Sequence, residues 1–281
     1  SPSRGLGDVY KRQGDTSAVD ALKKDLAELR NRKIHLLKSA GFPEDYLEPV
    51  YDCPDCKDTG YIGNKKCHCF KKAIIGLLYD QSNIKKFPVE ADFSNFRLDY
   101  YPVSHYDKKT GRSSRSMMED TLRICHHFID SFGTEFNNLF FYGDVGVGKT
   151  FLSTCIAKEI MNREYSVLYF SAPQLFNTLA KNAFDKNDID AHNMCEYIFD
   201  CDLLIIDDLG TEYTNAFIAS QFFTCINERL LHRKSTIIST NLSLESLADL
   251  YTERSFSRIT SRYSLLKIVG DDIRIKKKLE H

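Results

Sequence analysis

The chain has no long hydrophobic run, almost no net charge and no secretory leader pattern. None of its apolar segments approaches the roughly 18 residues that span a bilayer. The net charge is −1 over 281 residues, so any surface that attracts nucleic acid or a membrane must be local. The amino terminus shows no signal-peptide pattern. From these absences we expect a cytoplasmic protein without a membrane partner.

The composition is that of a protein with a normal core. Hydrophobic residues make up 42% and charged residues 27% of the chain, which predicts one domain plus a smaller appendage. We divide the sequence into residues 1–15, disordered or foreign to the fold; 16–85, an amino-terminal helix and a cysteine module; 86–116, a linker; 117–276, an α/β domain; and 277–281, a tail that partly resembles an expression-tag scar.

A glycine-rich stretch after an apolar run fits the phosphate-loop pattern G-x-x-x-x-G-K-S/T. A strand that ends in such a loop and leads into a helix turns its N–H groups toward one point, where the helix dipole favours negative charge. Lys149 would reach the outer phosphates, and Thr150 would ligate Mg²⁺. The alternative is a chance glycine turn. The nucleotide-binding candidates are Gly143, Asp144, Val145, Gly146, Val147, Gly148, Lys149, Thr150 and Phe151.

Two further strands are predicted to end in polar groups beside this loop. The apolar run 203–206 ends in Asp207 and Asp208, as a Walker B strand does. Asp207 would stand beside the Mg²⁺ held by Thr150, and Asp208 would polarise the attacking water. The strand 236–240 ends at Asn241, which can lie between the γ-phosphate and that water. As a lone residue Asn241 would only cap the following helix.

Arginines recur every four residues near the carboxyl end, at Arg254, Arg258 and Arg262. On a helix they share one face. An arginine from a neighbouring subunit can neutralise charge on a γ-phosphate, which requires an oligomer. The alternative is a row of surface ion pairs.

Four of the nine cysteines form two close pairs, Cys53 with Cys56 and Cys67 with Cys69. This spacing can bring four thiolates around one tetrahedral Zn²⁺. Four protein ligands leave no open position, so we expect a structural site. A module this small would take much of its folding free energy from the metal. The alternative is a loop of reduced cysteines.

Two segments have more than one interpretation. Residues 17–40 carry apolar residues at helical spacing, and this amphipathic helix would pack either on its neighbouring module or on a partner protein. Residues 85–115 interleave basic and aromatic residues, which suits single-stranded nucleic acid. We favour a linker whose aromatics dock on the next domain, with Phe93 and Phe96 near the adenine.

The rest of the chain alternates short apolar strands with helices. We predict strands at 139–142, 167–170, 203–207, 236–240 and 265–269, and helices near 150–162, 172–182, 190–199, 214–231 and 243–257. Strands separated by helices form a parallel sheet covered on both faces. The predicted class is therefore α/β.

Taken together, the phosphate loop, the D-D pair, the strand that ends S-T-N and the stretch E-R-x-x-S-R-I resemble the AAA+ ATPases of the DnaC/DnaI helicase-loader family. Relatives include the IstB-type transposition ATPases. The resemblance covers residues 87–276. The cysteine module looks like the amino-terminal metal-binding domain of DnaI-type loaders, which grips the replicative helicase.

The resemblance implies ATP or ADP, Mg²⁺ and a structural Zn²⁺ as cofactors. It makes Asn241 sensor 1, Arg258 the arginine finger with Arg254 as substitute, and Arg274 a second phosphate sensor. Few residues follow the last strand, so we expect no full helical lid. Between the second and third strands, family members place an extra helix that touches single-stranded DNA; Lys181 and Lys186 could contribute phosphate contacts.

From this resemblance we expect a slow ATPase, stimulated by its partners, that loads a DnaB-type replicative helicase onto single-stranded DNA in replication initiation or restart and forms an ATP-dependent homo-oligomer. One alternative is an IstB-like transposition helper ATPase. Another is a nucleotide-binding adaptor that never hydrolyses ATP.

Overall fold

The computed structural model describes residues 17–67, 69–70, 73, 91–185 and 187–279. The predicted disordered segment 1–15, Lys186 and the first residues of the predicted linker, 86–90, lie outside this part. The chain divides into two compact units, residues 1–59 and 60–281.

The first unit contains the predicted amphipathic helix, α2 (Ser17–Ser39). Gly41 ends it with a φ of +79°, as expected of glycine after a helix. The helix leaves four of its leucines between 58% and 62% exposed, and these are Leu22, Leu26, Leu29 and Leu36. Within its own unit, α2 therefore keeps an open apolar face.

The second unit begins with a small antiparallel hairpin, β1 (Tyr61–Ile62) and β2 (Lys65–Lys66). Its main sheet contains β3 (Leu139–Tyr142), β4 (Val167–Ser171), β5 (Leu203–Leu209), β6 (Ser235–Thr240) and β7 (Ser264–Lys267). The strand order is β4-β5-β6-β3-β7, and every pairing is parallel. This confirms the predicted five-stranded parallel sheet. Since the strands are parallel, the segments that follow β3, β5 and β6 meet at one edge.

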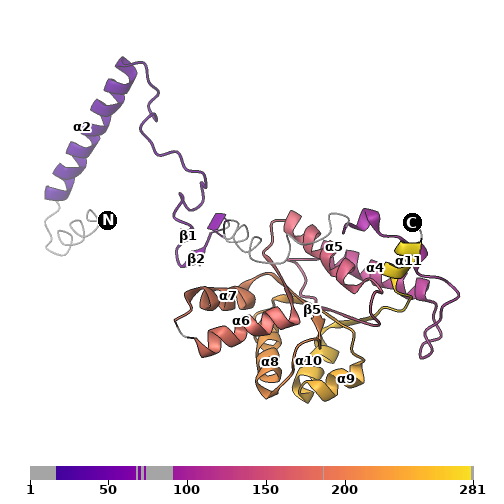
Figure 1. Ribbon diagram of the computed structural model, residues 1–281. Helices are drawn as coiled ribbons and strands as arrows, with labels where there is room; N and C mark the ends of the chain where they lie inside the picture. The colour runs from indigo at the N-terminus through magenta and orange to yellow at the C-terminus, as the bar shows by residue number, and fades with distance from the viewer. Residues whose placement is uncertain (1–16, 68, 71–72, 74–90, 186, 280–281) are drawn as a thin grey trace. The chain divides into compact units, whose positions relative to one another are not determined.

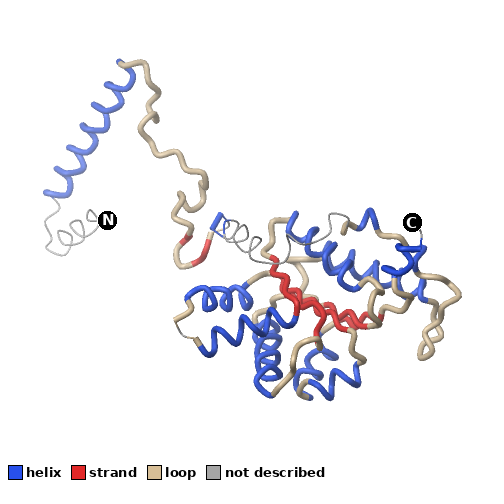
Figure 2. The backbone as a smooth tube through the Cα atoms, in the orientation of Figure 1, coloured by secondary structure: helices blue, strands red, loops and turns tan. Residues whose placement is uncertain are grey.

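Helices cover both faces of this sheet (Figures 1 and 2). Alternate strand residues such as Phe140 and Phe141 point into two separate cores, as side-chain alternation along a strand requires. One core packs under α4 (Ser114–Asp130) and α5 (Lys149–Asn162). The other packs under α6 (Ala172–Phe184), α7 (Ile189–Asp200), α8 (Ala216–Leu231), α9 (Leu244–Leu250) and α10 (Glu253–Arg262). In the described chain, one short helix follows β7, α11 (Ile273–Leu279).

The prediction of a single helix near 243–257 is wrong, because the chain forms two helices there, α9 and α10. Tyr251 and Thr252 are extended, and the Thr252 hydroxyl accepts a hydrogen bond from the Ser255 backbone N–H at 3.3 Å. A threonine that caps a new helix stops the previous one. The arginine row thereby begins a helix of its own.

Most aromatic residues of segment 91–113 dock on the α/β domain, as the favoured linker interpretation predicts. The segment forms two short 3₁₀ turns, η2 (Phe93–Asn95) and η3 (Leu98–Tyr100). Tyr100 and Tyr101 are buried at 7% and 1% exposure, and both belong to the core under α4 and α5. This segment therefore supplies a wall to the domain that follows it.

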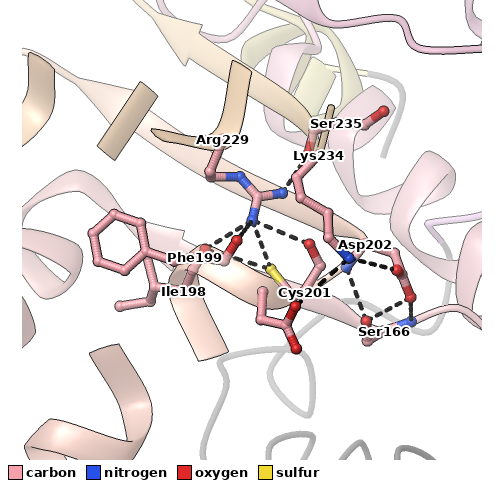
Figure 3. Close-up of polar contacts among 9 residues, drawn as sticks. Ser166, Ile198, Phe199, Cys201, Asp202, Arg229, Lys234 and Ser235 are labelled. Carbon is pink, nitrogen blue, oxygen red and sulfur yellow. Dashed lines mark hydrogen bonds and ion pairs between the residues drawn. The ribbon is translucent and has the colours of Figure 1, made fainter. Parts of the chain in front are cut away.

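A buried arginine joins the amino-terminal ends of two strands (Figure 3). Arg229, on α8, is 1% exposed. Its guanidinium donates to the carbonyl oxygens of Ile198 at 2.7 Å, Cys201 at 3.1 Å and Ser235 at 2.6 Å, and its Nε to the Thr236 hydroxyl at 3.0 Å. These acceptors lie at the end of α7 and the start of β6. The network thus holds together the segments that lead into β5 and β6.

Candidate nucleotide-binding site

The phosphate loop turns at a glycine that has no room for a side chain. A Cβ on Gly143 would lie 2.1 Å from the Ile268 carbonyl oxygen, and its φ is +145°. Both facts require glycine. The loop leads directly into α5, whose first residue is Lys149. The backbone is therefore arranged as the sequence predicts for a loop that binds phosphate.

Lys149 is buried, at 4% exposure. Its ammonium donates to the carbonyl oxygens of Gly143 at 2.7 Å and Asp144 at 2.6 Å. Burial lowers the pKa of Lys149, while the nearby carboxylates of Asp208 and Asp207 oppose that shift. The cation is held over the loop by acceptors that belong to the loop itself.

Asp207 is fixed by hydroxyl groups from two neighbouring strands. Tyr169, on β4, donates to its Oδ2 at 2.7 Å, and Ser239, on β6, donates to its Oδ1. The Thr150 hydroxyl lies 3.4 Å from the same Oδ1. Carboxylate and hydroxyl oxygens suit Mg²⁺, so Thr150 and Asp207 fit the metal site predicted for them.

Tyr169 and Ser239 are functional-site residues that the sequence pattern alone does not single out. Tyr169 lies on β4 and Ser239 on β6, the two strands that flank β5 in the sheet, and both side chains are buried. A polar side chain in a strand buried on both faces was the available signal, since it requires a buried partner.

Asp208 has an unusual backbone conformation. Its φ is +56°, and the pairing of β5 with β6 shifts register between Ile206 and Leu209. Its backbone N–H donates to the Ser239 hydroxyl at 3.0 Å. Burial, followed by the charge of Asp207, raises the pKa of the Asp208 carboxyl. A raised pKa makes this carboxylate a better proton acceptor than an ordinary aspartate.

Most of the predicted nucleotide-binding residues converge on one cavity of about 480 Å³, whereas Gly143, Asp144 and Val147 of the phosphate loop do not line it. This volume is typical of small-molecule sites. Lys149, Thr150 and Phe151 line it from the start of α5. Its other walls include Asp207, Asp208, Asn241 and Arg274. Residues from β5 and from the segments that follow β3, β6 and β7 thus meet at the carboxyl edge of the sheet.

A second wall comes from the segment before α4. Phe96, Arg97, Tyr100 and Tyr101 line the cavity. The Tyr101 hydroxyl donates to the Val147 carbonyl oxygen at 2.8 Å, and its ring stacks on Phe96 with centroids 5.7 Å apart. Phe93 is not among the lining residues and packs against His126 instead. Of the two phenylalanines expected near the base, only Phe96 lines the cavity.

The predicted arginine fingers do not line this cavity. Arg254 is exposed on α10. Arg258 donates from Nε to the Asn227 side-chain oxygen at 3.2 Å and lies over the Phe223 ring. An arginine that acts on a neighbouring subunit has to lie outside its own site, so this position is compatible with the predicted role.

The loop after β5 is tied to the start of α10. The Glu212 carboxylate accepts a hydrogen bond from the Gly210 backbone N–H at 3.0 Å and another from the Tyr251 hydroxyl. Tyr251 is buried and directly precedes the Thr252 cap of α10. The arginine row is therefore anchored to the loop that follows the acid pair.

The four clustered cysteines bring their sulfur atoms together. In Cys53, Cys56, Cys67 and Cys69, every Sγ lies within 4.8 Å of the others. Asp58 accepts the Cys53 backbone N–H at 2.8 Å, and Cys67 donates its N–H to the Gly60 carbonyl oxygen at 2.8 Å. Four thiols at this separation fit a tetrahedral Zn²⁺.

Among the residues that the structure describes, no helix is both long enough and apolar enough to cross a membrane.

Comparison with known proteins agrees with this geometry. The family model described as IstB-like ATP binding protein matches residues 81–281. The phage-like element PBSX protein XkdC of Bacillus subtilis (strain 168) is 27% identical over 236 residues, covering 79% of this chain and 83% of that protein. A crystal structure of the DnaC helicase loader has a TM-score of 0.50 and 26% identity, covering 62% of this chain and 97% of that one.

The replicative helicase loader DnaI of the same Bacillus strain is 29% identical over 115 residues, 41% of this chain. That match spans only 36% of DnaI. Two of these similar proteins, DnaC and DnaI, are named as helicase loaders. Since the family model matches well over half of the residues, this chain belongs to the IstB-like ATP-binding protein family.

Proposed function

We propose that this protein is an ATP-dependent loader that places a DnaB-type replicative helicase on single-stranded DNA during replication initiation or restart. The observation that carries the proposal is the meeting of Lys149, Thr150, the Asp207–Asp208 pair and Asn241 in one cavity. The similarity to two helicase loaders supports the replication role.

In the proposed ATPase, each polar group of the cavity has a separate task. Lys149 holds the outer phosphates, and Thr150 with Asp207 holds Mg²⁺, which neutralises charge on the phosphates when it is bound. Asp208 accepts a proton from the attacking water, and Asn241 orients that water. The raised pKa of Asp208 supports its role as the base.

The proposed oligomer follows from the position of the arginines. Arg258, or Arg254 in its place, would reach the γ-phosphate of a neighbouring subunit. Their location on α10, outside the cavity of their own chain, supports this arrangement.

Single-stranded DNA is the proposed ligand of an exposed aromatic surface beside α6. Phe184 is 77% exposed and lies 5.0 Å from the ring of Phe217. Tyr213, on the loop after β5, is 90% exposed. Exposed aromatic rings stack on bases regardless of sequence, and Lys181 adds a positive charge. This surface supports the proposed contact with DNA.

The amino-terminal part is the proposed helicase-docking module. The open leucine face of α2 supports docking on an apolar helical partner. A Zn²⁺ held by the four cysteines would keep residues 53–69 folded. Zinc is therefore proposed as structural.

The decisive experiment measures phosphate release and helicase loading together. With single-stranded DNA and helicase present, Asp208→Asn should lower phosphate release by about 10²–10⁴-fold while ATP still binds. The wild type should also transfer helicase to a single-stranded circle in an ATP-dependent way. ATP binding without any phosphate release in either protein would favour the adaptor, and hydrolysis without helicase transfer would favour the transposition helper.

A further inference from the structure

The segment after β7 crosses directly over the phosphate loop. The Ile273 backbone N–H donates to the Gly146 carbonyl oxygen at 3.0 Å. A Cβ on Gly146 would lie 2.1 Å from the carboxyl carbon of Asp272. An acidic side chain thus packs against a loop whose backbone is arranged to bind anions.

The same carboxylate holds Arg274. Asp272 accepts the Arg274 backbone N–H at 2.9 Å, and its two oxygens lie 3.3 Å and 3.4 Å from the guanidinium nitrogens. The Arg274 side chain is 65% exposed, against 26% for Asp272, and it lines the cavity. The arginine can therefore turn toward a ligand while the acid stays against the loop.

We propose that Asp272 is a built-in competitor of the nucleotide phosphates: it pairs with the Arg274 guanidinium, competes with the phosphates for it, and thereby sets how tightly ATP binds. This inference rests on the proposed nucleotide site and adds the residue that regulates its affinity. A triphosphate must take the guanidinium from Asp272 and also approach a carboxylate of its own charge. Both effects weaken binding, and both disappear when Asp272 is neutral.

Asp272→Asn tests this directly. Asparagine can still accept the Arg274 N–H and begin α11, so the substitution removes the charge and keeps the local turn. ATP affinity, measured by titration calorimetry with Mg²⁺ on the full chain, should tighten by about 3- to 10-fold, the range of one partly screened charge pair. The gain should be smaller for ADP and should shrink in high salt.

Asp271→Asn is the matched control. Asp271 lies next to Asp272 in the chain but pairs with Lys276 at 2.9 Å and His105 at 3.6 Å rather than with Arg274. Neutralising Asp271 should leave ATP affinity unchanged. In an Arg274→Ala background, Asp272→Asn should give a smaller gain than in the wild type, because the two side chains act as a pair.

Two results overturn the proposal. Unchanged affinity in Asp272→Asn would show that the carboxylate does not compete. Weaker affinity would show that Asp272 instead directs Arg274 toward the phosphates. Either result with a wild type that binds ATP leaves the nucleotide site intact, whereas a wild type that binds no nucleotide removes the site and the competitor together.

Discussion

Two buried cations in this fold form the same kind of hydrogen bond but serve different purposes. Lys149 is 4% exposed and Arg229 is 1% exposed, and both donate to backbone carbonyl oxygens. The acceptors of Arg229 belong to separate elements, the end of α7 and the start of β6. Those of Lys149 belong to the loop that immediately precedes it. Arg229 therefore fastens distant segments, whereas Lys149 fastens only its own loop.

Arg229 is therefore a structural cation, whereas the hydrogen bonds of Lys149 can be exchanged for bonds to a ligand. If Arg229 left its acceptors, several buried carbonyl oxygens would lose their charged donor, and a lost hydrogen bond to a buried carbonyl costs free energy. Lys149 faces a cavity that also contains Asp207 and Asp208, so an incoming phosphate can take over the ammonium. Burial alone does not mark a functional residue, but burial beside an open polar cavity does.

The largest expected effect comes from breaking the permanent network. Arg229→Met should lower the free energy of unfolding by about 3–5 kcal/mol, because several buried carbonyl oxygens lose their donor at once. Urea denaturation followed by circular dichroism measures this loss. Arg123→Met, at an arginine whose side chain is 74% exposed, should change stability by less than about 0.5 kcal/mol. Equal stability of the two variants would contradict a structural role for Arg229.

The second test replaces Lys149, the other buried cation. Lys149→Met should weaken ATP binding by about 2–3 kcal/mol, roughly 30- to 150-fold, because a charged hydrogen bond to the phosphates is lost. The same variant should unfold no more easily than the wild type, since burial disfavours the charged lysine in the folded protein. Titration calorimetry and urea denaturation check the two halves. A large loss of stability would erase the contrast with Arg229.

A smaller effect is expected at Asp208, one of the two aspartates that line the cavity. The pKa of Asp208 is raised by burial and by Asp207, so the folded state holds its proton more tightly than the unfolded state does. Stability is then lost as pH rises from the ordinary pKa of aspartate through the raised pKa of the folded protein. Asp208→Asn should therefore stabilise the empty protein at pH 7. Its advantage should vanish when denaturation is repeated below about pH 4, the ordinary range of aspartate.

The smallest effect on the nucleotide domain should follow metal removal. A chelator should strip the proposed zinc and unfold residues 53–69, because a metal-bound module this small depends on its ion. ATP affinity should change less than about two-fold, since the phosphate loop draws on a separate core. Elemental analysis before and after chelation, with calorimetry on both samples, checks this. One zinc per chain is expected at the start, and its absence would remove the zinc assignment.

The sequence allowed the sheet and most of the site to be predicted because the relevant signals are local. An apolar run followed by Gly143, by Asp207 or by Asn241 marks both a strand and the chemistry at its end. Parallel pairing then brings those ends to one edge. None of this required knowledge of side-chain contacts.

The features that escaped prediction depend on contacts between distant segments. The hydroxyls of Tyr169 and Ser239 acquire their role only when β4 and β6 flank β5. Tyr101 reaches Val147 across 46 positions of the chain. The break between α9 and α10 was missed because apolar residues continue on both sides of Thr252, and a capping threonine resembles any other polar residue in that pattern.

The left-handed backbone at position 208 constrains the kind of acid that can stand there. Short polar side chains such as aspartate and asparagine tolerate positive φ, because they bond to nearby backbone, whereas longer side chains are rarer in that region. A glutamate would extend farther toward a substrate but would be less favourable at this positive φ. The backbone conformation therefore limits how far the proposed base can reach. Because a short base reaches less far toward the attacking water, we expect slow ATP hydrolysis.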